Sequence, residues 1–225
     1  MPSNDIDESG ERLLAGVRRF QREVYPKQKA AYQQLAQEGQ KPHALFITCA
    51  DSRIDPELIT QSGPGETFVS RNIGNLVPAY GEMLDSVSAI IEYAVAGLKV
   101  SQVVVCGHSD CGAMIGLLHP AKVAQLPLLK SWLRGGDTAL SVVRSRNTAA
   151  DERAALDELI EANVLQQLHH LRTHRSVAGR PAKATALSGW VYDIGHGTVR
   201  IYNEEQRKFL PVTGDEQAAS GGASQ

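Results

Sequence analysis

The chain has 225 residues, 42% of them hydrophobic, with a formal net charge of −2 at pH 7 and a pI of about 6.4. This length supports one large α/β core, and the near-neutral charge gives no reason to expect nucleic acid or an anionic membrane as a partner. No apolar run approaches the ~20 residues of a transmembrane helix, and neither three cysteines nor the polar amino terminus suggests secretion, so we expect a cytoplasmic protein.

The first part of the chain predicts an N-terminal helical arm over residues 1–39. Apolar residues at three- and four-residue spacing, from Leu13 to Phe20, form a stripe along a helical region of about residues 8–37. Pro26 should break this region into two helices, the second over roughly residues 27–37. Such an arm has too little core of its own, so we expect it to pack on another surface, such as a second subunit.

A buried strand is predicted over residues 44–49, where a short apolar run ends in Cys49. Asp51 and Arg53 follow at alternate positions, so all three side chains share one side if the backbone stays extended. Downstream, the pattern predicts a short helix over 56–59, a strand over 67–71 and a helix over 83–98.

A second apolar run, residues 103–106, predicts another strand, which Gly107 should end. His108 and Cys111 follow it. Open α/β sheets place ligands outside the carboxyl ends of their strands, so we expect these two side chains to meet Cys49 there. Three such ligands without a fourth are typical of catalytic rather than structural zinc. Cys106 should belong to the core.

The remainder predicts helices and an antiparallel hairpin. In chain order, we expect helices over 111–118, 126–133 and 150–173 and strands over 184–193 and 198–203. The fold class is therefore α/β, with a mostly parallel central sheet flanked by helices, an N-terminal helical arm and an antiparallel C-terminal edge. The zinc-binding α/β domain should span residues 40–213, and residues 214–225 should form a disordered tail.

Two readings of Asp51 and Arg53 are open. They can form a surface ion pair of little energetic value. Alternatively, Arg53 keeps Asp51 ionised beside the metal, where it orients a zinc-bound hydroxide. The two-residue spacing directly after Cys49 favours the second reading. It also allows Asp51 to become a fourth zinc ligand in a closed state. The remaining histidines lack partners at metal spacing and are interpreted as surface or loop residues: His43, His119, His169, His170, His174 and His196.

Residues 49–53 (Cys-Ala-Asp-Ser-Arg) and 108–111 (His-Ser-Asp-Cys) resemble the signature of the β-class carbonic anhydrases, and the resemblance covers roughly residues 40–118. It implies a zinc enzyme that interconverts carbon dioxide and bicarbonate. By motif position, the ligands of one Zn²⁺ per subunit would be Cys49, His108 and Cys111, and the catalytic dyad would be Asp51 and Arg53.

The resemblance further implies a substrate pocket and an assembly. Positions that line the pocket in plant-type members correspond to Gln40, Phe68, Ile73 and Tyr93. Members form dimers, sometimes paired into tetramers, with the active site near the subunit interface. In one subgroup that closes its site with aspartate, a tryptophan stands three residues before the first cysteine. Phe46 occupies that position here, which favours the open, plant-type state.

Other functions are weighed against this one. A hydrolase of carbonyl sulfide or carbon disulfide would use the same zinc chemistry on the same scaffold. A non-catalytic protein with structural zinc needs a permanent fourth ligand, for which Asp51 is the candidate. A zinc deaminase needs His-x-Glu and Pro-Cys-x-x-Cys, and a thiol-redox protein needs Cys-x-x-Cys; the sequence contains neither set of motifs.

Overall fold

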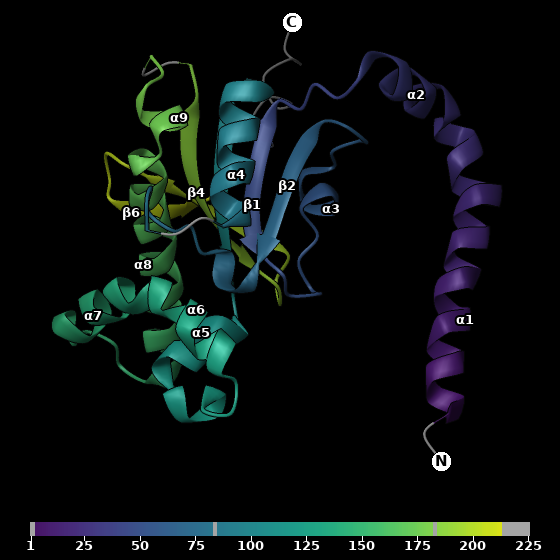
Figure 1. Ribbon diagram of the computed structural model, residues 1–225. Helices are drawn as coiled ribbons and strands as arrows, with labels where there is room; N and C mark the ends of the chain where they lie inside the picture. Colours follow the sequence, from purple (N-terminus) through teal and green to yellow (C-terminus); the bar gives the residue numbers. More distant parts are fainter. Residues whose placement is uncertain (1–2, 83–84, 182–183, 213–225) are drawn as a thin grey trace, which may run out of the picture. The chain divides into compact units, whose positions relative to one another are not determined.

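The computed structural model describes residues 3–82, 85–181 and 184–212 (Figure 1). The described residues divide into two compact units: an N-terminal unit that ends at Lys41 and includes residues 64–66, and a main unit that contains the rest. The predicted tail, residues 214–225, lies outside the described residues. No helix in the described part of the chain is long and apolar enough to span a membrane.

The N-terminal unit is helical from Ser3 to Glu38, without the break expected at Pro26. Helix α1 (Ser3–Arg19) continues through a π-helical segment, Phe20–Val24, into α2 (Tyr25–Glu38). Proline lacks an N–H, and its ring collides with the carbonyl four residues earlier in a regular helix. The wider π-turn ends at Val24, two residues before Pro26, which lies in the first turn of α2, and so the helical path accommodates the ring.

The main unit is built on a six-stranded sheet in the order β2-β1-β3-β4-β5-β6. The strands are β1 (Ala44–Cys49), β2 (Thr67–Asn72), β3 (Gln102–His108), β4 (Ala186–Asp193), β5 (Thr198–Asn203) and β6 (Lys208–Pro211). The first four strands in this order, β2, β1, β3 and β4, are parallel, whereas β5 and β6 add an antiparallel edge. The predicted fold class is confirmed, and β6 is a strand that the sequence pattern missed.

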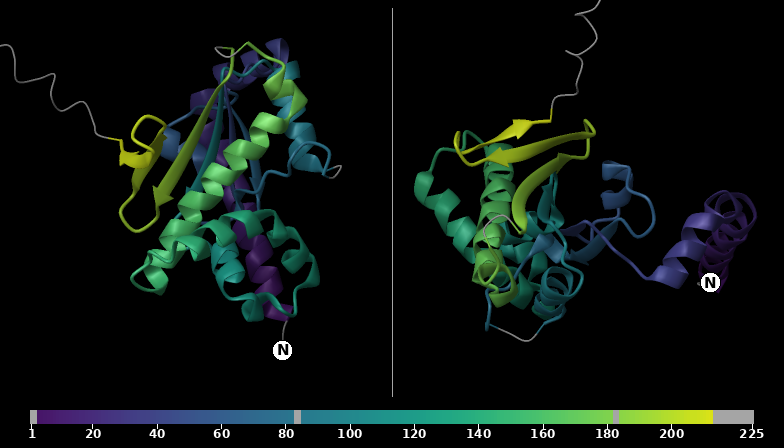
Figure 2. Two further views of the ribbon diagram at one scale, coloured as in Figure 1. Left: turned by 90° about the vertical axis from the view of Figure 1, so that its left-hand side faces the viewer. Right: turned by 90° about the horizontal axis from the view of Figure 1, so that it is seen from above.

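Helices cover the sheet and close its carboxyl end (Figures 1 and 2). They are α3 (Pro56–Thr60), α4 (Ser86–Glu92), α5 (Gly112–Leu118), α6 (Pro127–Leu133), α7 (Asp137–Arg146), α8 (Glu152–Thr173) and α9 (Arg175–Ala178). A π-helical segment, Tyr93–Gly97, extends α4. Asp85 caps α4, so the helix begins after the predicted start at residue 83, which lies outside the described residues. The sequence pattern missed α7 and α9.

The core follows the alternation of side chains along the strands. Leu45 and Ile47 of β1 face the larger cluster, together with apolar side chains of α4 and α8. Phe46, between them in sequence, faces the opposite side and packs against Ile54 and Trp190 in a smaller cluster. This two-residue period is what a strand buried on both faces produces.

Gly107 does not end β3, contrary to the expectation from sequence, because the strand continues to His108. Its function is to allow close packing with α8. A Cβ atom at this position would lie 2.9 Å from Cγ2 of Val164 and 3.2 Å from Cγ2 of Ile160. The missing side chain therefore lets α8 approach the strand that carries His108.

Candidate metal centre

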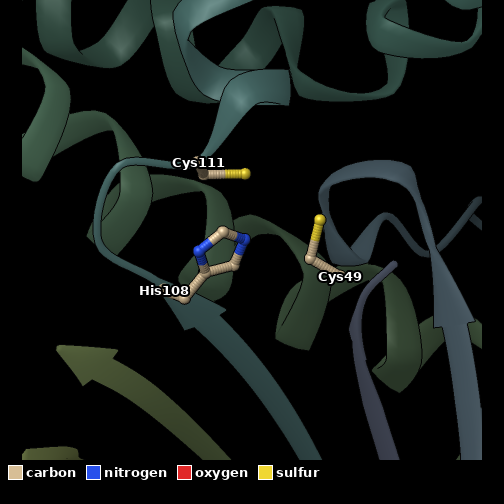
Figure 3. A group of neighbouring side chains, drawn as sticks. All are labelled: Cys49, His108 and Cys111. Atoms are coloured by element: carbon tan, nitrogen blue, oxygen red, sulfur yellow. The ribbon is translucent and has the colours of Figure 1, made fainter. Parts of the chain in front are cut away.

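Three buried side chains converge at the carboxyl end of the parallel strands (Figure 3). Cys49 is the last residue of β1, His108 is the last residue of β3, and Cys111 caps the amino terminus of α5. Since β1 and β3 are parallel neighbours, their ends meet at one edge of the sheet. The Sγ atoms and a ring nitrogen of His108 all lie within 4.8 Å of one another.

His108 presents a free lone pair to this group. Its Nδ1 lies 2.9 Å from the carbonyl oxygen of Ser109. A carbonyl can only accept a hydrogen bond, so in the neutral imidazole Nδ1 carries the proton and Nε2 the lone pair. Nε2 is fully buried and has no hydrogen-bond partner among the described residues. A buried polar atom without a partner is costly, and a cation at this position would satisfy it.

The two thiols are arranged to share one proton. A hydrogen bond from the Cys111 thiol, helped by the N–H of Gly74 at 3.4 Å, lowers the pKa of Cys49 to about 4, although burial opposes the shift. The pKa of Cys111 is raised, because its proton is held by Cys49 and because the side chain is buried. One nitrogen and two sulfur ligands with these properties fit zinc.

Cys106 takes no part in the centre, as expected. It is fully buried, and burial raises the pKa of its thiol to about 12. Such a thiol stays protonated at neutral pH and is a poor metal ligand.

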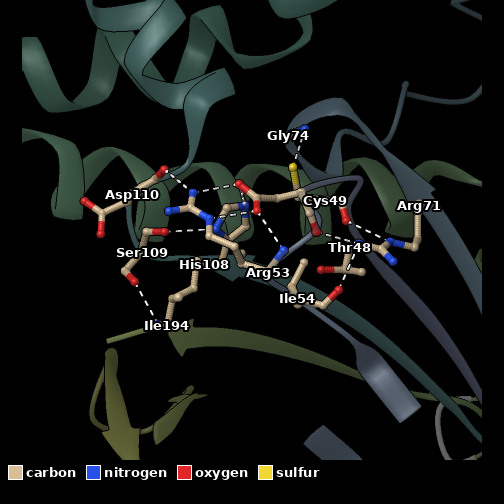
Figure 4. Close-up of polar contacts among 12 residues, drawn as sticks. Thr48, Cys49, Arg53, Ile54, Arg71, Gly74, His108, Ser109, Asp110 and Ile194 are labelled. Carbon is tan, nitrogen blue, oxygen red and sulfur yellow. Dashed lines mark hydrogen bonds and ion pairs between the residues drawn. The ribbon is translucent and has the colours of Figure 1, made fainter. Parts of the chain in front are cut away.

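Arg53 lies beside the centre (Figure 4). The N–H of Ile54 donates to the carbonyl oxygen of Asp51 at 3.2 Å, so Asp51 and Arg53 belong to a turn rather than to an extended segment. The Arg53 side chain donates hydrogen bonds to both carboxylate oxygens of Asp51, with Nε 2.9 Å from Oδ1 and Nη2 2.7 Å from Oδ2. The backbone N–H of Arg53 adds a third hydrogen bond, to Oδ1. The guanidinium holds the pKa of Asp51 well below its usual range. Oδ2 lies 4.0 Å from Nε2 of His108.

Arg71, which the sequence analysis did not single out, holds this turn in place. Its side chain donates to the carbonyl oxygens of Cys49, Asp51 and Ile54, at 3.2, 2.6 and 2.8 Å. Arg71 lies on β2, and its backbone pairs with Thr48 directly before Cys49. A charged residue at the predicted end of a neighbouring strand was the available signal, but the carbonyls that it contacts come from the turn.

Asp110 connects Arg53 to α8. Its backbone is left-handed, with φ 54°, and its carbonyl oxygen accepts a hydrogen bond from Nη2 of Arg53 at 3.2 Å. Its carboxylate forms an ion pair with Arg153, which α8 carries and which also approaches Asp157. This connection, too, was missed from sequence because it joins segments 43 residues apart.

The predicted pocket residues fall in different places. Phe68 and Tyr93 lie together, with ring centroids 5.8 Å apart. Ile73, in the 3-10 turn Ile73–Asn75, and Tyr93 are 42% and 52% exposed in the single chain. Gln40 belongs to the N-terminal unit, and its placement in the pocket stays a prediction.

Two histidines depart from the surface or loop role expected of them. His174 is 2% exposed, and its Nε2 lies 2.9 Å from the carbonyl oxygen of Pro78. The adjacent α8 residue His170 contacts the carbonyl oxygen of Val77 through Nδ1, at 2.6 Å. Both imidazoles bind the backbone that follows the turn at Gly74, so their polar character serves an internal contact rather than solvent.

Comparisons with known proteins agree with this geometry. A family model described as carbonic anhydrase matches residues 44–199. A carbonic anhydrase of Pseudomonas aeruginosa is 46% identical over 201 residues, covering 89% of this chain and 90% of that protein. The solved structure of the β-carbonic anhydrase CcaA has a TM-score of 0.88 at 35% identity, covering 92% and 94% of the two chains. A structure from a report on two tetrameric β-carbonic anhydrases of Sordaria macrospora has a TM-score of 0.69 at 30% identity, covering 89% and 97%.

Proposed function

The chain belongs to the β-class carbonic anhydrases, and from this membership we propose that Cys49, His108 and Cys111 hold one Zn²⁺ per subunit for the reversible hydration of carbon dioxide. The observation that carries the proposal is the buried, unpartnered Nε2 of His108 facing two thiols. When bound, zinc supplies a Lewis acid that lowers the pKa of a water ligand from 15.7 to roughly 7. Two thiolates and one imidazole leave a fourth position for that water.

Asp51 and Arg53 form the proposed catalytic dyad. The two hydrogen bonds from the Arg53 guanidinium keep the Asp51 carboxylate ionised and fix its orientation. From its place 4.0 Å from Nε2 of His108, the Oδ2 atom of Asp51 can accept a hydrogen bond from the attacking water or hydroxide and so aim its lone pair at the substrate carbon. Because Arg53 engages both carboxylate oxygens, we place the resting enzyme in the open state, with Asp51 off the metal.

The substrate pocket is proposed to be an apolar wall with one amide donor. Phe68, Ile73 and Tyr93 suit an uncharged linear molecule such as carbon dioxide, and two of these side chains are in contact. The Gln40 amide would donate a hydrogen bond to the oxygen on which negative charge develops. The product is bicarbonate and a proton.

We place the enzyme in the cytoplasm and as a dimer or tetramer. The three cysteines are free thiols, and the two that face the centre must stay reduced to bind a metal, which a reducing compartment ensures. Self-association is supported by apolar side chains that the arm leaves exposed and by the tetrameric relatives from Sordaria macrospora. Carbon dioxide and bicarbonate are the small-molecule partners, with neither nucleic acid nor membrane.

Stopped-flow hydration of carbon dioxide, on protein of known zinc content from about pH 6.5 to about pH 9, tests the function. Zinc-dependent hydration near neutral pH is the expected result. Activity that appears only at alkaline pH would instead place Asp51 on the metal at neutral pH. Full zinc occupancy without hydration would contradict the proposal. Carbonyl sulfide or carbon disulfide would then be tested as substrates, before the structural-zinc reading is accepted.

A further inference from the structure

The peptide bond between Ile73 and Gly74 is held at both ends. Its carbonyl oxygen accepts a hydrogen bond from the indole N–H of Trp132, at 2.8 Å. Its N–H donates to the sulfur of Cys49 at 3.4 Å (Figure 4). The bond is trans, so these two groups point in opposite directions from one rigid plane. The orientation of the carbonyl, set by Trp132, therefore fixes where the N–H points.

This peptide needs an external hold because of the residue that follows it. Gly74 has φ 78°, which is non-helical within the turn Ile73–Asn75. A Cβ atom there would lie 2.9 Å from Cβ of Ala113, so glycine is required, and glycine is also the residue with the most conformational freedom. The next carbonyl, of Gly74 itself, accepts from the buried Asn163 amide at 3.1 Å. Side chains from α6 and α8 thus fix the peptides on both sides of Gly74.

We propose that Trp132 is a positioning residue of the metal centre, which aims the Gly74 N–H at the Cys49 sulfur and strengthens it as a donor. A hydrogen bond to the carbonyl of a peptide polarises its N–H. A stronger donor withdraws charge from the Cys49 thiolate, which leaves a bound cation more Lewis-acidic. The inference rests on the proposed role of Cys49 as a zinc ligand.

Trp132→Phe removes the indole N–H while keeping an aromatic ring. The matched control is Trp190→Phe, because the Trp190 indole donates to Ser188 at 2.7 Å and packs on Phe46 on the other face of the sheet. Both variants and the wild type are loaded with Co²⁺. In Trp132→Phe the sulfur-to-cobalt charge-transfer band should move to longer wavelength, because the thiolate, with a weaker hydrogen bond from Gly74, gives more electron density to the metal.

Two further measurements use the zinc-loaded proteins. Competition with a chelator should show zinc affinity lowered about tenfold in Trp132→Phe, because the loss of the N–H that holds the Cys49 sulfur in place outweighs the stronger donation of its thiolate; tenfold is the lower end of the usual effect of losing such a partner. The pH profile of hydration should shift to alkaline pH, since a less acidic metal raises the pKa of its water ligand. In Trp190→Phe, the band, the affinity and the pH profile should all stay at their wild-type values.

The outcomes separate this inference from the proposed function. A wild-type cobalt protein without a charge-transfer band would overturn the ligand assignment and, with it, the inference. A wild-type band that is unchanged in Trp132→Phe, together with unchanged zinc affinity, would overturn the inference alone. If Trp132→Phe does not fold, the inference is tested with the Trp190→Phe protein instead. Trp132 is the only tryptophan left in that variant, so its fluorescence can be followed alone. Its emission should change when a chelator removes zinc, and unchanged emission would overturn the inference.

Discussion

The histidine and one of the two cysteines of the centre already have the protonation that a cation requires. Ser109 fixes the proton of His108 on Nδ1, and Cys49 is held as a thiolate by hydrogen bonds from Cys111 and Gly74. Only the thiol proton of Cys111 remains to be displaced. A divalent cation would therefore meet a site whose ligand atoms are oriented before it binds, which lowers the cost of binding.

The ligand assignment predicts that Cys49→Ser and His108→Ala lose zinc and hydration activity together, because two remaining ligands hold the metal poorly. Zinc content after dialysis, measured by atomic absorption, checks the first loss, and stopped-flow hydration checks the second. Cys106→Ala is the matched control, since Cys106 lies in the core and should leave zinc content unchanged. Full zinc content in either ligand variant would contradict the assignment.

The dyad predicts that Asp51→Asn keeps its zinc but loses turnover by a factor on the order of 10², the upper end of the usual effect of a group that orients a metal-bound ligand. Asparagine keeps the shape, but its amide carries no negative charge and accepts a weaker hydrogen bond from the attacking water. Stopped-flow hydration at full zinc occupancy gives kcat. Wild-type kcat in this variant would remove Asp51 from the catalytic machinery.

The same pair sets a pH dependence of stability. Arg53 lowers the pKa of Asp51 in the folded state, so the stabilisation is fully present above the unfolded-state pKa of about 3.9 and is lost as pH falls through the lower folded value. The free energy of unfolding of zinc-loaded wild type, relative to Asp51→Asn, should therefore be the same at about pH 6 as at about pH 8. A difference that changes between these pH values would show that Asp51 titrates there.

Helix α8 acts as a polar template for the loop that carries Gly74. The buried surface of the helix includes the polar side chains of Asn163, Gln166 and Gln167. The half-buried His170 and, just beyond the end of the helix, the buried His174 add to them. These groups bind backbone atoms from Gly74 to Pro78 and from Gly135 to Ala139. The loop next to the metal centre is therefore fixed by a helix about 90 residues away in sequence.

A substitution of Gln167 tests whether the polar side chains of α8 hold this loop in place. Gln167 is fully buried, accepts from the N–H of Val77 at 2.8 Å and donates to Oδ1 of Asn163 at 2.9 Å. Gln167→Leu leaves both partners buried and unpaired, so we expect a loss of about 2–4 kcal/mol in the free energy of unfolding. Denaturant titration measures it. His169→Leu, an exposed position on the same helix, should stay within about 0.5 kcal/mol, and an equally small change in Gln167→Leu would refute the template.

At the scale of the whole molecule, the N-terminal unit leaves a row of apolar side chains exposed in the single chain: Leu13, Leu14, Val17, Phe20 and Val24. Apolar surface of this extent on one helical arm is typical of an interaction site. In the proposed dimer or tetramer, a second copy of the chain would cover this apolar surface.

Replacement of Leu14 and Val17 by lysine should therefore shift the protein toward smaller species, because charged side chains cannot be buried at a subunit interface without partners. Sedimentation velocity of the full-length protein reads the mass as a multiple of 24.3 kDa. Gln21→Lys, an exposed polar position on the arm, adds a charge without removing apolar surface and should leave the assembly intact. An unchanged mass in the double variant would exclude the arm from the interface.

The sequence by itself determined the strand that ends in Cys49, the presence of a second buried strand just before His108, although not its end, and the family to which the chain belongs. Buried parallel strands are continuous apolar runs, and the residues after them must lie at one edge of the sheet, so local patterns carried this information. The tertiary structure decided the rest. Gly107 could only be understood once α8 was seen against it. Arg71 and Trp132 donate hydrogen bonds to backbone carbonyl oxygens, and residue types along a sequence do not tell which carbonyls lie within reach. Contacts between distant segments depend on how the elements pack, and that packing is set by the whole chain at once.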